Sequence, residues 1–449
     1  MLLPVTLAGT LAGTLPQHGI GGRQDLPIPL GLAVTGAGVA IALSFVILAV
    51  AWRSPKYRGA SSGTALPPKA VAALDSPWLR WIVRLFGLAV FAYAGMALLA
   101  GADRLTNPIF GFVYILVWVG LVPLSLVLGP IWRTLNPLRT VHLLACRLLR
   151  HDPRMGLLQL SPRVGLWPAA AGILAFAWLE LVAPDRATLV VLQAWLSLYV
   201  VIVLFGAVLF GDRWFAAADP FEAYATLMAK LSPWGRRTDG AIVIRRPLEN
   251  LDSLRPQPGL VALVAALLGS TAYDGFSRSS LWIAWSQDSG YSQTLLGTVV
   301  LILFIGFVLA TYSAATVLAG RLLDSVSLPG LFAHSVVPIV LGYVIAHYFT
   351  LLVLEGQRTL ILLSDPLSNG SNVFGTGLLG VNAGITNHAG AIASVQVGAV
   401  VVGHLLGVVA AHDRAVALFP RSRALAGQIP LLVVMVAYTV GGLLLLFSA

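Results

Sequence analysis

Ten long apolar runs constrain the fold of this 449-residue chain more than any other feature of its sequence. Each has about 17 or more mostly apolar residues, enough for an α-helix to cross a hydrocarbon layer of roughly 30 Å. The runs are Pro29–Trp52, Trp81–Ala100, Phe110–Leu128, Val164–Leu181, Thr188–Phe210, Gly259–Gly275, Leu295–Leu318, Pro329–Leu354, Ala391–Ala411 and Ile429–Ser448.

The composition agrees with these runs. Hydrophobic residues make up 58% of the chain and charged residues only 10%, and the mean hydropathy is +0.87. Soluble globular proteins have about 25% charged residues, so that class is excluded. We therefore expect an all-α, polytopic integral membrane bundle of about ten transmembrane helices.

The basic residues indicate how these helices are oriented. If the amino terminus lies outside, 23 of the 28 lysines and arginines fall in inner segments and five in outer ones. Cytoplasmic loops of membrane proteins carry such an excess. We therefore expect a plasma-membrane protein with both termini extracytoplasmic. Topology and attraction to an anionic inner leaflet then explain the net charge of +10, so nucleic acid is not an expected partner.

The chain is expected to contain one transmembrane domain, 29–448, preceded by an outer segment, 1–28. Residues 1–15 are apolar with no basic residue ahead of them, which fits either an irregular signal peptide or a short interfacial stretch. The linker Arg53–Asp75 is basic, contains Ser, Gly and Pro, and is expected to be mobile. The largest outer loop, 355–390, is rich in Gly and Asn, and loops of this length often act as lids.

Two inner segments, 129–163 and 212–258, repeat one pattern: a glycine, a tryptophan, then Asn or Asp before proline. Asn136 and Asp219 are typical N-caps, and Glu222 would complete a capping box with Asp219. Apolar residues follow at helical spacing, so we expect two amphipathic helices at the inner interface. The repetition fits an internal duplication or, equally, common helix-entry chemistry at a basic interface.

The first of these helices carries further reactive side chains. His142 and His151 are expected to have surface roles. Cys146, the only cysteine of the chain, is expected to be an inert thiol, and no intramolecular disulfide can form.

Four more histidines lie in the eighth and ninth apolar runs or at their ends: His334, His347, His404 and His412. Ionisable groups at membrane depth usually face protein or a water-filled cavity. None of their pairs has the i, i+4 spacing of a single-helix metal site, so any site would be assembled between helices. Metal binding, hydrogen-bonded packing and a proton relay are the three interpretations.

Other polar residues lie at the predicted outer ends of several runs: Glu180, Gln193, Tyr273, Asp274, His347, Glu355 and Gln396, with His388 in the adjoining loop. Asp274 lies in the shortest run, and interrupted spans often mark binding sites. Converging carboxylates and imidazoles can bind a divalent or transition metal and activate water. The alternative is a ring of polar residues at the ends of spans, wetted by lipid headgroups.

The metal hypothesis assigns roles to particular side chains. The metal ligands would be His347, His388, Asp274 and His404, and the general base would be Glu355. The substrate or proton path would pass His334, Gln396, Tyr273 and Glu180.

Six segments distributed along most of the chain carry a resemblance: HGIGGRQDLPIP, NPLRTVHLL, ADPFEAYATLMAKLSPW, LLGSTAYDGFS, AHYFTLLV and GHLLGVVAAHDRA. They resemble a group of actinobacterial multi-spanning membrane proteins, some of which are labelled fenitrothion hydrolase-like. The resemblance implies membrane-bound hydrolysis of an organophosphate ester. It supplies no catalytic motif, so no residue takes its role from it.

Three functions follow from this sequence. The first is a membrane enzyme that hydrolyses an ester with metal-activated water at an outer site. The second is a transporter or permease, in which the same polar residues bind a small solute or a proton. The third is a non-catalytic subunit of a membrane assembly, whose histidines only pack.

Overall fold

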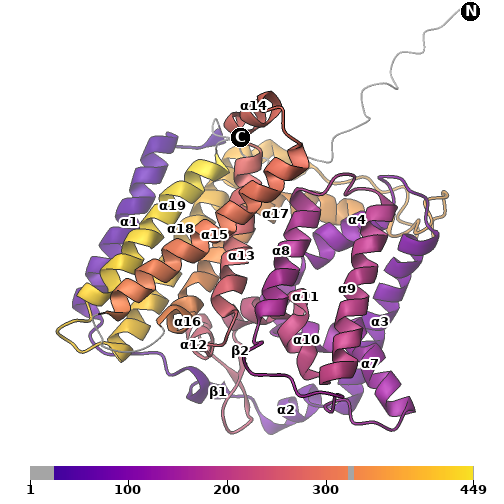
Figure 1. Ribbon diagram of the computed structural model, residues 1–449, viewed down its shortest axis with the longest axis horizontal. Helices are drawn as coiled ribbons and strands as arrows, with labels where there is room; N and C mark the ends of the chain where they lie inside the picture. Colours follow the sequence, from indigo (N-terminus) through magenta and orange to yellow (C-terminus); the bar gives the residue numbers. More distant parts are fainter. Residues whose placement is uncertain (1–24, 322–327, 448–449) are drawn as a thin grey trace, which may run out of the picture.

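The computed structural model describes residues 25–321 and 328–447, and their regular structure is almost entirely helical (Figure 1). Within these ranges, eight helices are long and apolar enough to cross a membrane, which confirms the all-α polytopic bundle. The apolar stretch 1–15 lies outside the described residues. The crossing helices are built on α1 (Leu30–Ala51), α3 (Pro77–Ala100), α9 (Leu189–Phe210), α13 (Leu260–Ser277), α15 (Gln293–Gly320), α17 (Val337–Leu362), α18 (Ala389–Leu418) and α19 (Ile429–Leu446).

Two of the ten expected spans differ from straight crossing helices. The third consists of α4 (Pro108–Gly111), the π-helix η3 (Phe112–Val117) and α5 (Leu121–Leu128), with a bend of 44°. Pro123 of α5 has no N–H to donate, and its ring crowds the carbonyl four residues earlier, so the bend has a local cause. The fourth, α8 (Trp167–Leu181), has only 15 residues. If the bent pair counts as one span, the described residues contain nine.

Loops from distant parts of the chain meet at one end of the bundle, at the bottom of Figure 1. There β1 (Thr64–Ala65), β2 (Trp234–Arg236) and β3 (Ile242–Ile244) form an antiparallel sheet in the order β1–β3–β2. Paired strands lie about 5 Å apart, so the loops before α3 and after α9 are on the same side. This agrees with the predicted grouping of basic loops, and we call this end the basic face.

The linker 53–75 is more ordered than its composition suggested. It contains β1 and α2 (Pro68–Leu74). The carboxylate of Asp413, on α18, accepts hydrogen bonds from the backbone N–H groups of Lys56 and Tyr57 and from the indole N–H of Trp52. These contacts fix the linker to the basic face, so the expectation of a mobile linker is wrong.

The remaining short helices connect the crossing ones. On or near the basic face lie α6 (Trp132–Leu135), α7 (Pro137–Leu148), α10 (Arg213–Ala218), α11 (Pro220–Met228), α12 (Pro247–Asp252) and α16 (Leu328–Phe332), and at the opposite face lies α14 (Ser280–Asp288). The predicted outer loop begins later than expected, because α17 continues to Leu362.

The two repeated inner segments adopt the same local structure. Each has a glycine with positive φ, Gly129 or Gly211, where a side chain would be strained. A short helix follows, then an N-cap whose side-chain Oδ1 accepts two backbone N–H bonds from the next helix. Asn136 caps α7 and Asp219 caps α11 in this way, as the sequence predicts.

Equivalent residues of the two segments also bind each other. The Nδ2 of Asn136 donates to the Oδ2 of Asp219 at 2.6 Å. Three residues further along each helix, Arg139 makes two hydrogen bonds of 2.5 and 2.7 Å to the carboxylate of Glu222. The predicted capping box is therefore wrong, because Glu222 pairs with Arg139 across the repeat. This reciprocal pairing supports the interpretation as an internal repeat.

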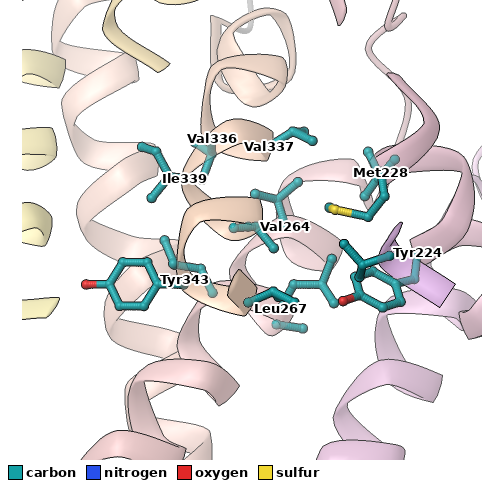
Figure 2. Close-up of a cluster of buried hydrophobic side chains, with 14 of the residues drawn as sticks. Tyr224, Met228, Val264, Leu267, Val336, Val337, Ile339 and Tyr343 are labelled. Atoms are coloured by element: carbon teal, nitrogen blue, oxygen red, sulfur yellow. The ribbon is translucent and has the colours of Figure 1, made fainter. Parts of the chain in front are cut away.

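The two helices that follow these caps have different surroundings. α7 exposes Val141, Leu144 and Leu148, as expected for a helix at a membrane interface. In contrast, eight of the nine residues of α11 are buried. Figure 2 shows its Tyr224 and Met228 in a buried apolar cluster with residues of α13 and α17. The expectation that this second helix is interfacial is wrong.

The two histidines of the first inner segment, His142 and His151, differ in exposure. The side chain of His142 is buried, with its ring against Phe215 and its Nε2 3.3 Å from the carbonyl of Pro153. A surface role is therefore wrong for His142. His151 is exposed, as expected, and its Nε2 lies 2.9 Å from the carbonyl of Met155.

The helices α17 and α18 pack at very short range through glycine. A Cβ on Gly342 would lie 2.5 Å from the carbonyl oxygen of Ala399, and one on Gly403 would lie 2.6 Å from that of Pro338. Small residues permit such approach between membrane helices. His404 directly follows Gly403, so it lies at this close contact between α17 and α18.

Candidate functional site

A buried carboxylate, that of Asp274, lies where α13 packs against α17. Its Oδ2 is 3.0 Å from the hydroxyl of Tyr348, which donates to it, and 2.7 Å from the Nε2 of His347. Its Oδ1 accepts a hydrogen bond of 2.6 Å from the guanidinium of Arg278. The sequence prediction that Asp274 and His347 come together is thus confirmed. We call these four residues the Asp274 cluster.

Helical spacing explains how the cluster forms. Asp274 and Arg278 are four residues apart on α13, so their side chains lie on the same face. His347 and Tyr348 are neighbours on α17, and the carboxylate lies between their side chains. α13 also packs against α8, α15 and α19. These neighbours bury α13 on most sides.

The contact between His347 and Asp274 has ion-pair length but imperfect hydrogen-bond geometry. The two atoms are 2.7 Å apart, yet the ring is not oriented so that its Nε2 forms a hydrogen bond. The distance shows that the two groups interact. The distance is within the hydrogen-bond reach that direct proton transfer between two side chains requires.

The Asp274 cluster lies towards the face opposite the basic face. Asp274 lies near the end of α13 that leads into α14, at the top of Figure 1. The side chain of Arg278 is 27% exposed, whereas that of Asp274 is 2% exposed. Arg278 therefore connects a buried carboxylate to the surface of the protein.

A second carboxylate, that of Glu180 on α8, lies near the cluster. It is buried, and its charge interacts with those of Asp274, Arg278 and Arg186. Two acidic and two basic groups thus gather around one end of α13. Such groups are costly at membrane depth and usually mark ion or substrate pathways.

Other predicted site residues lie elsewhere. The ring of Tyr273 faces Trp282 and Phe304 rather than Asp274. Glu355 is two turns, or about 12 Å, beyond His347 along α17, and its carboxylate pairs with Arg358 at 3.1 Å. This position does not support a role as general base at the cluster. Gln396 is buried on α18.

The predicted metal ligands do not form one set. His388 is exposed in a 3₁₀ turn, η6 (Gly384–His388), where its Nδ1 faces the carbonyl of Gly384. Across the described ranges, no group of three or more His, Cys, Asp or Glu side chains is arranged to hold a metal ion. Only Asp274 and His347 of the four predicted ligands lie in contact.

The remaining buried histidines contact main-chain and amide groups. His334 faces the carbonyls of Leu331 and Ala410 at 3.1 and 3.3 Å. His412 bridges Gln428 Oε1 and the carbonyl of Trp52 at 2.8 and 2.9 Å. These contacts agree with the packing interpretation.

His404 differs from these two histidines. Its Nδ1 lies 2.9 Å from the carbonyl of Val400. Its Nε2 is buried without a hydrogen-bond partner among the residues that the structure describes. Its ring packs edge-on against Tyr343, one turn before His347 on α17.

Sequence reasoning missed two members of the cluster, Arg278 and Tyr348. The signal for Arg278 is its i, i+4 spacing from Asp274. Tyr348 directly follows His347, and only the packing of α13 against α17 shows that both side chains reach the same carboxylate.

Comparison with known protein families, with curated proteins and with solved structures finds no match. The organophosphate hydrolysis implied by the resemblance therefore stays a prediction. The long apolar helices of the structure identify the chain as a multi-pass, all-α membrane protein.

Proposed function

We propose that this protein is a permease that moves protons across the plasma membrane, and that the Asp274 cluster binds and releases the transported proton. The single observation that carries the proposal is the contact of one buried carboxylate with His347, Tyr348 and Arg278. Intramembrane acidic and imidazole groups are typical of proton relays in pumps and transporters.

The proposed role of each residue follows from its contact. Asp274 carries the proton, and His347 exchanges it, since the two groups are 2.7 Å apart. Tyr348 donates a hydrogen bond that holds the carboxylate in place. When Asp274 is protonated, its attraction to Arg278 weakens, so the guanidinium at the end of α13 is released from the carboxylate. This step couples proton binding to a change at the surface end of the Asp274 cluster.

The bent span formed by α4, η3 and α5 lies next to the helix that carries His347. The π-helix η3 and the helix α4 pack against α17, which carries His347. π-Helical segments are often found at functional sites, and discontinuous membrane helices frequently form the binding sites of transporters. The bent span is thus a candidate for the part that moves.

The distribution of basic residues supports the orientation. The basic face would be cytoplasmic by the positive-inside rule, and the Asp274 cluster would then lie towards the extracytoplasmic side.

The arrangement of the side chains favours proton binding over metal-activated ester hydrolysis, because only two of the four proposed metal ligands, Asp274 and His347, are in contact.

Proton movement in liposomes tests this proposal. Purified protein is reconstituted with a pH-sensitive dye inside, and a pH gradient is imposed while potassium and valinomycin fix the membrane potential. We expect proton entry in the wild type to exceed that in Asp274→Asn and His347→Gln at least tenfold. The control is Asp288→Asn, which removes an exposed carboxylate at the end of α14 and should behave like the wild type. Equal proton entry with wild type and Asp274→Asn would overturn the proposal.

A further inference from the structure

Two arginines lie against one tryptophan ring near the basic face. The guanidinium carbon of Arg84 lies 5.4 Å from the ring centroid of Trp81, and that of Arg147 lies 4.6 Å from it. Arg84 and Trp81 belong to α3, and Arg147 belongs to the last turn of α7. Both distances are within the range of cation–π attraction, so the ring holds two positive charges close together.

Neither of these arginines has an acidic partner among the residues that the structure describes. The neighbouring arginines do, since Arg80 pairs with Asp75 and Arg139 pairs with Glu222. The charges acting on Arg84 come from Arg80, Arg139 and Arg147, all of which repel it. Since no acidic side chain among the described residues offsets this repulsion, an anion close to both arginines would be attracted to them. The site therefore has the charge pattern of an anion-binding fork.

Exposed apolar side chains lie on the same helix faces as this site. On α3, Trp78 and Leu85, about one turn before and after Trp81, are 80% and 54% exposed, and on α7, Leu148 is 85% exposed. A free inorganic anion would gain nothing from contact with these apolar side chains. A ligand with a negative head and apolar chains would contact both the arginines and this surface. The position at the start of a crossing helix is also where lipid headgroups lie.

We propose that Arg84 and Arg147 bind the phosphate of an anionic phospholipid, whose acyl chains lie along the exposed faces of α3 and α7. Arginine forks match phosphate geometry, and basic pockets between membrane helices bind acidic headgroups. The lipid neutralises the repulsion between the two arginines and connects α7 to α3. This inference is independent of the permease proposal, because the site lies at the other face.

Native mass spectrometry of the full-length protein tests this site. The protein is titrated in detergent with phosphatidylglycerol or with phosphatidylcholine. We expect one phosphatidylglycerol to bind at least tenfold more tightly than phosphatidylcholine. Removing both arginines, as Arg84→Gln/Arg147→Gln, should weaken that first binding event roughly 30-fold, since each basic residue near an anionic lipid surface contributes about five- to sixfold.

The matched control removes two exposed arginines elsewhere in the basic loops, as Arg154→Gln/Arg163→Gln. The same change in net charge should alter the first binding event less than threefold. An equal loss in the control would show general electrostatic attraction and would overturn the proposal. Complete competition by inorganic phosphate at roughly millimolar concentration would show a simple anion site. This result would also overturn the proposal.

Discussion

The contact between Asn136 and Asp219 yields a sharp prediction, because its two side chains are not interchangeable. Each side chain uses its Oδ1 to cap its own helix. What remains is the Nδ2 of Asn136 and the Oδ2 of Asp219, which meet at 2.6 Å. One of the two positions must therefore supply a donor and the other an acceptor.

The size of the effect follows from this geometry. Asn136→Asp would place two buried carboxylates against each other, and their repulsion at an effective dielectric constant of about 20 is roughly 4–6 kcal/mol. Asp219→Asn would oppose two amide N–H₂ groups and leave both unsatisfied, at a cost of about 1–3 kcal/mol. The exchange Asn136→Asp/Asp219→Asn restores one donor and one acceptor, so we expect it to be within about 1–2 kcal/mol of the wild type.

Thermal unfolding of the detergent-solubilised protein measures these differences. Asn136→Asp should be the least stable variant at pH 8, and it should recover partly at pH 5, because two close carboxylates can share one proton. The exchange variant should unfold at a higher temperature than either single variant. If the exchange variant is as unstable as the sum of the two single changes, the reciprocal pairing is refuted.

Two further predictions concern packing and a surface ion pair. A Cβ on Gly442 would lie 0.9 Å from the hydroxyl of Tyr343, so Gly442→Ala should lower the stability by about 2–4 kcal/mol. Gly441→Ala, whose Cβ meets open space, should be nearly neutral in the same unfolding assay, and equal effects would contradict the packing. The hydrogen bond from Arg236 lowers the pKa of Asp75, so this pair stabilises the fold above the unfolded pKa of about 4 and its contribution is lost as the pH falls. Because the pair is partly exposed, Asp75→Asn should cost less than about 1 kcal/mol at pH 7, and the difference from wild type should shrink towards pH 3; a difference that grows in acid would contradict it.

Much of the fold could be predicted from local rules. Apolar run length identifies the crossing helices because a helix rises about 1.5 Å per residue through a layer of known thickness. The N-caps Asn136 and Asp219 could be recognised because capping depends on residues next to each other in the chain. The grouping of the basic loops followed from charge alone, and the sheet β1–β3–β2 agrees with it.

The parts that could not be predicted depend on which helices are neighbours. An apolar stripe has the same pattern whether it faces lipid or protein, so the burial of α11 could not be seen in its sequence. For the same reason, local rules predict the N-cap backbone N–H as the partner of Glu222, whereas the structure shows Arg139, 83 residues away. Asp274 and His347 could be placed at similar depth, but their contact depends on how α13 and α17 are rotated.

Infrared difference spectroscopy tests the central claim, the binding of a proton at the Asp274 cluster, most directly. The protein in lipid bilayers is stepped from about pH 8 to about pH 3, which crosses the ordinary carboxyl pKa of about 4, and the C=O band of newly protonated carboxyl groups is recorded. We predict that Asp274→Asn removes one component of this band and that His347→Gln shifts the same component. A band that is unchanged in both variants would contradict the account.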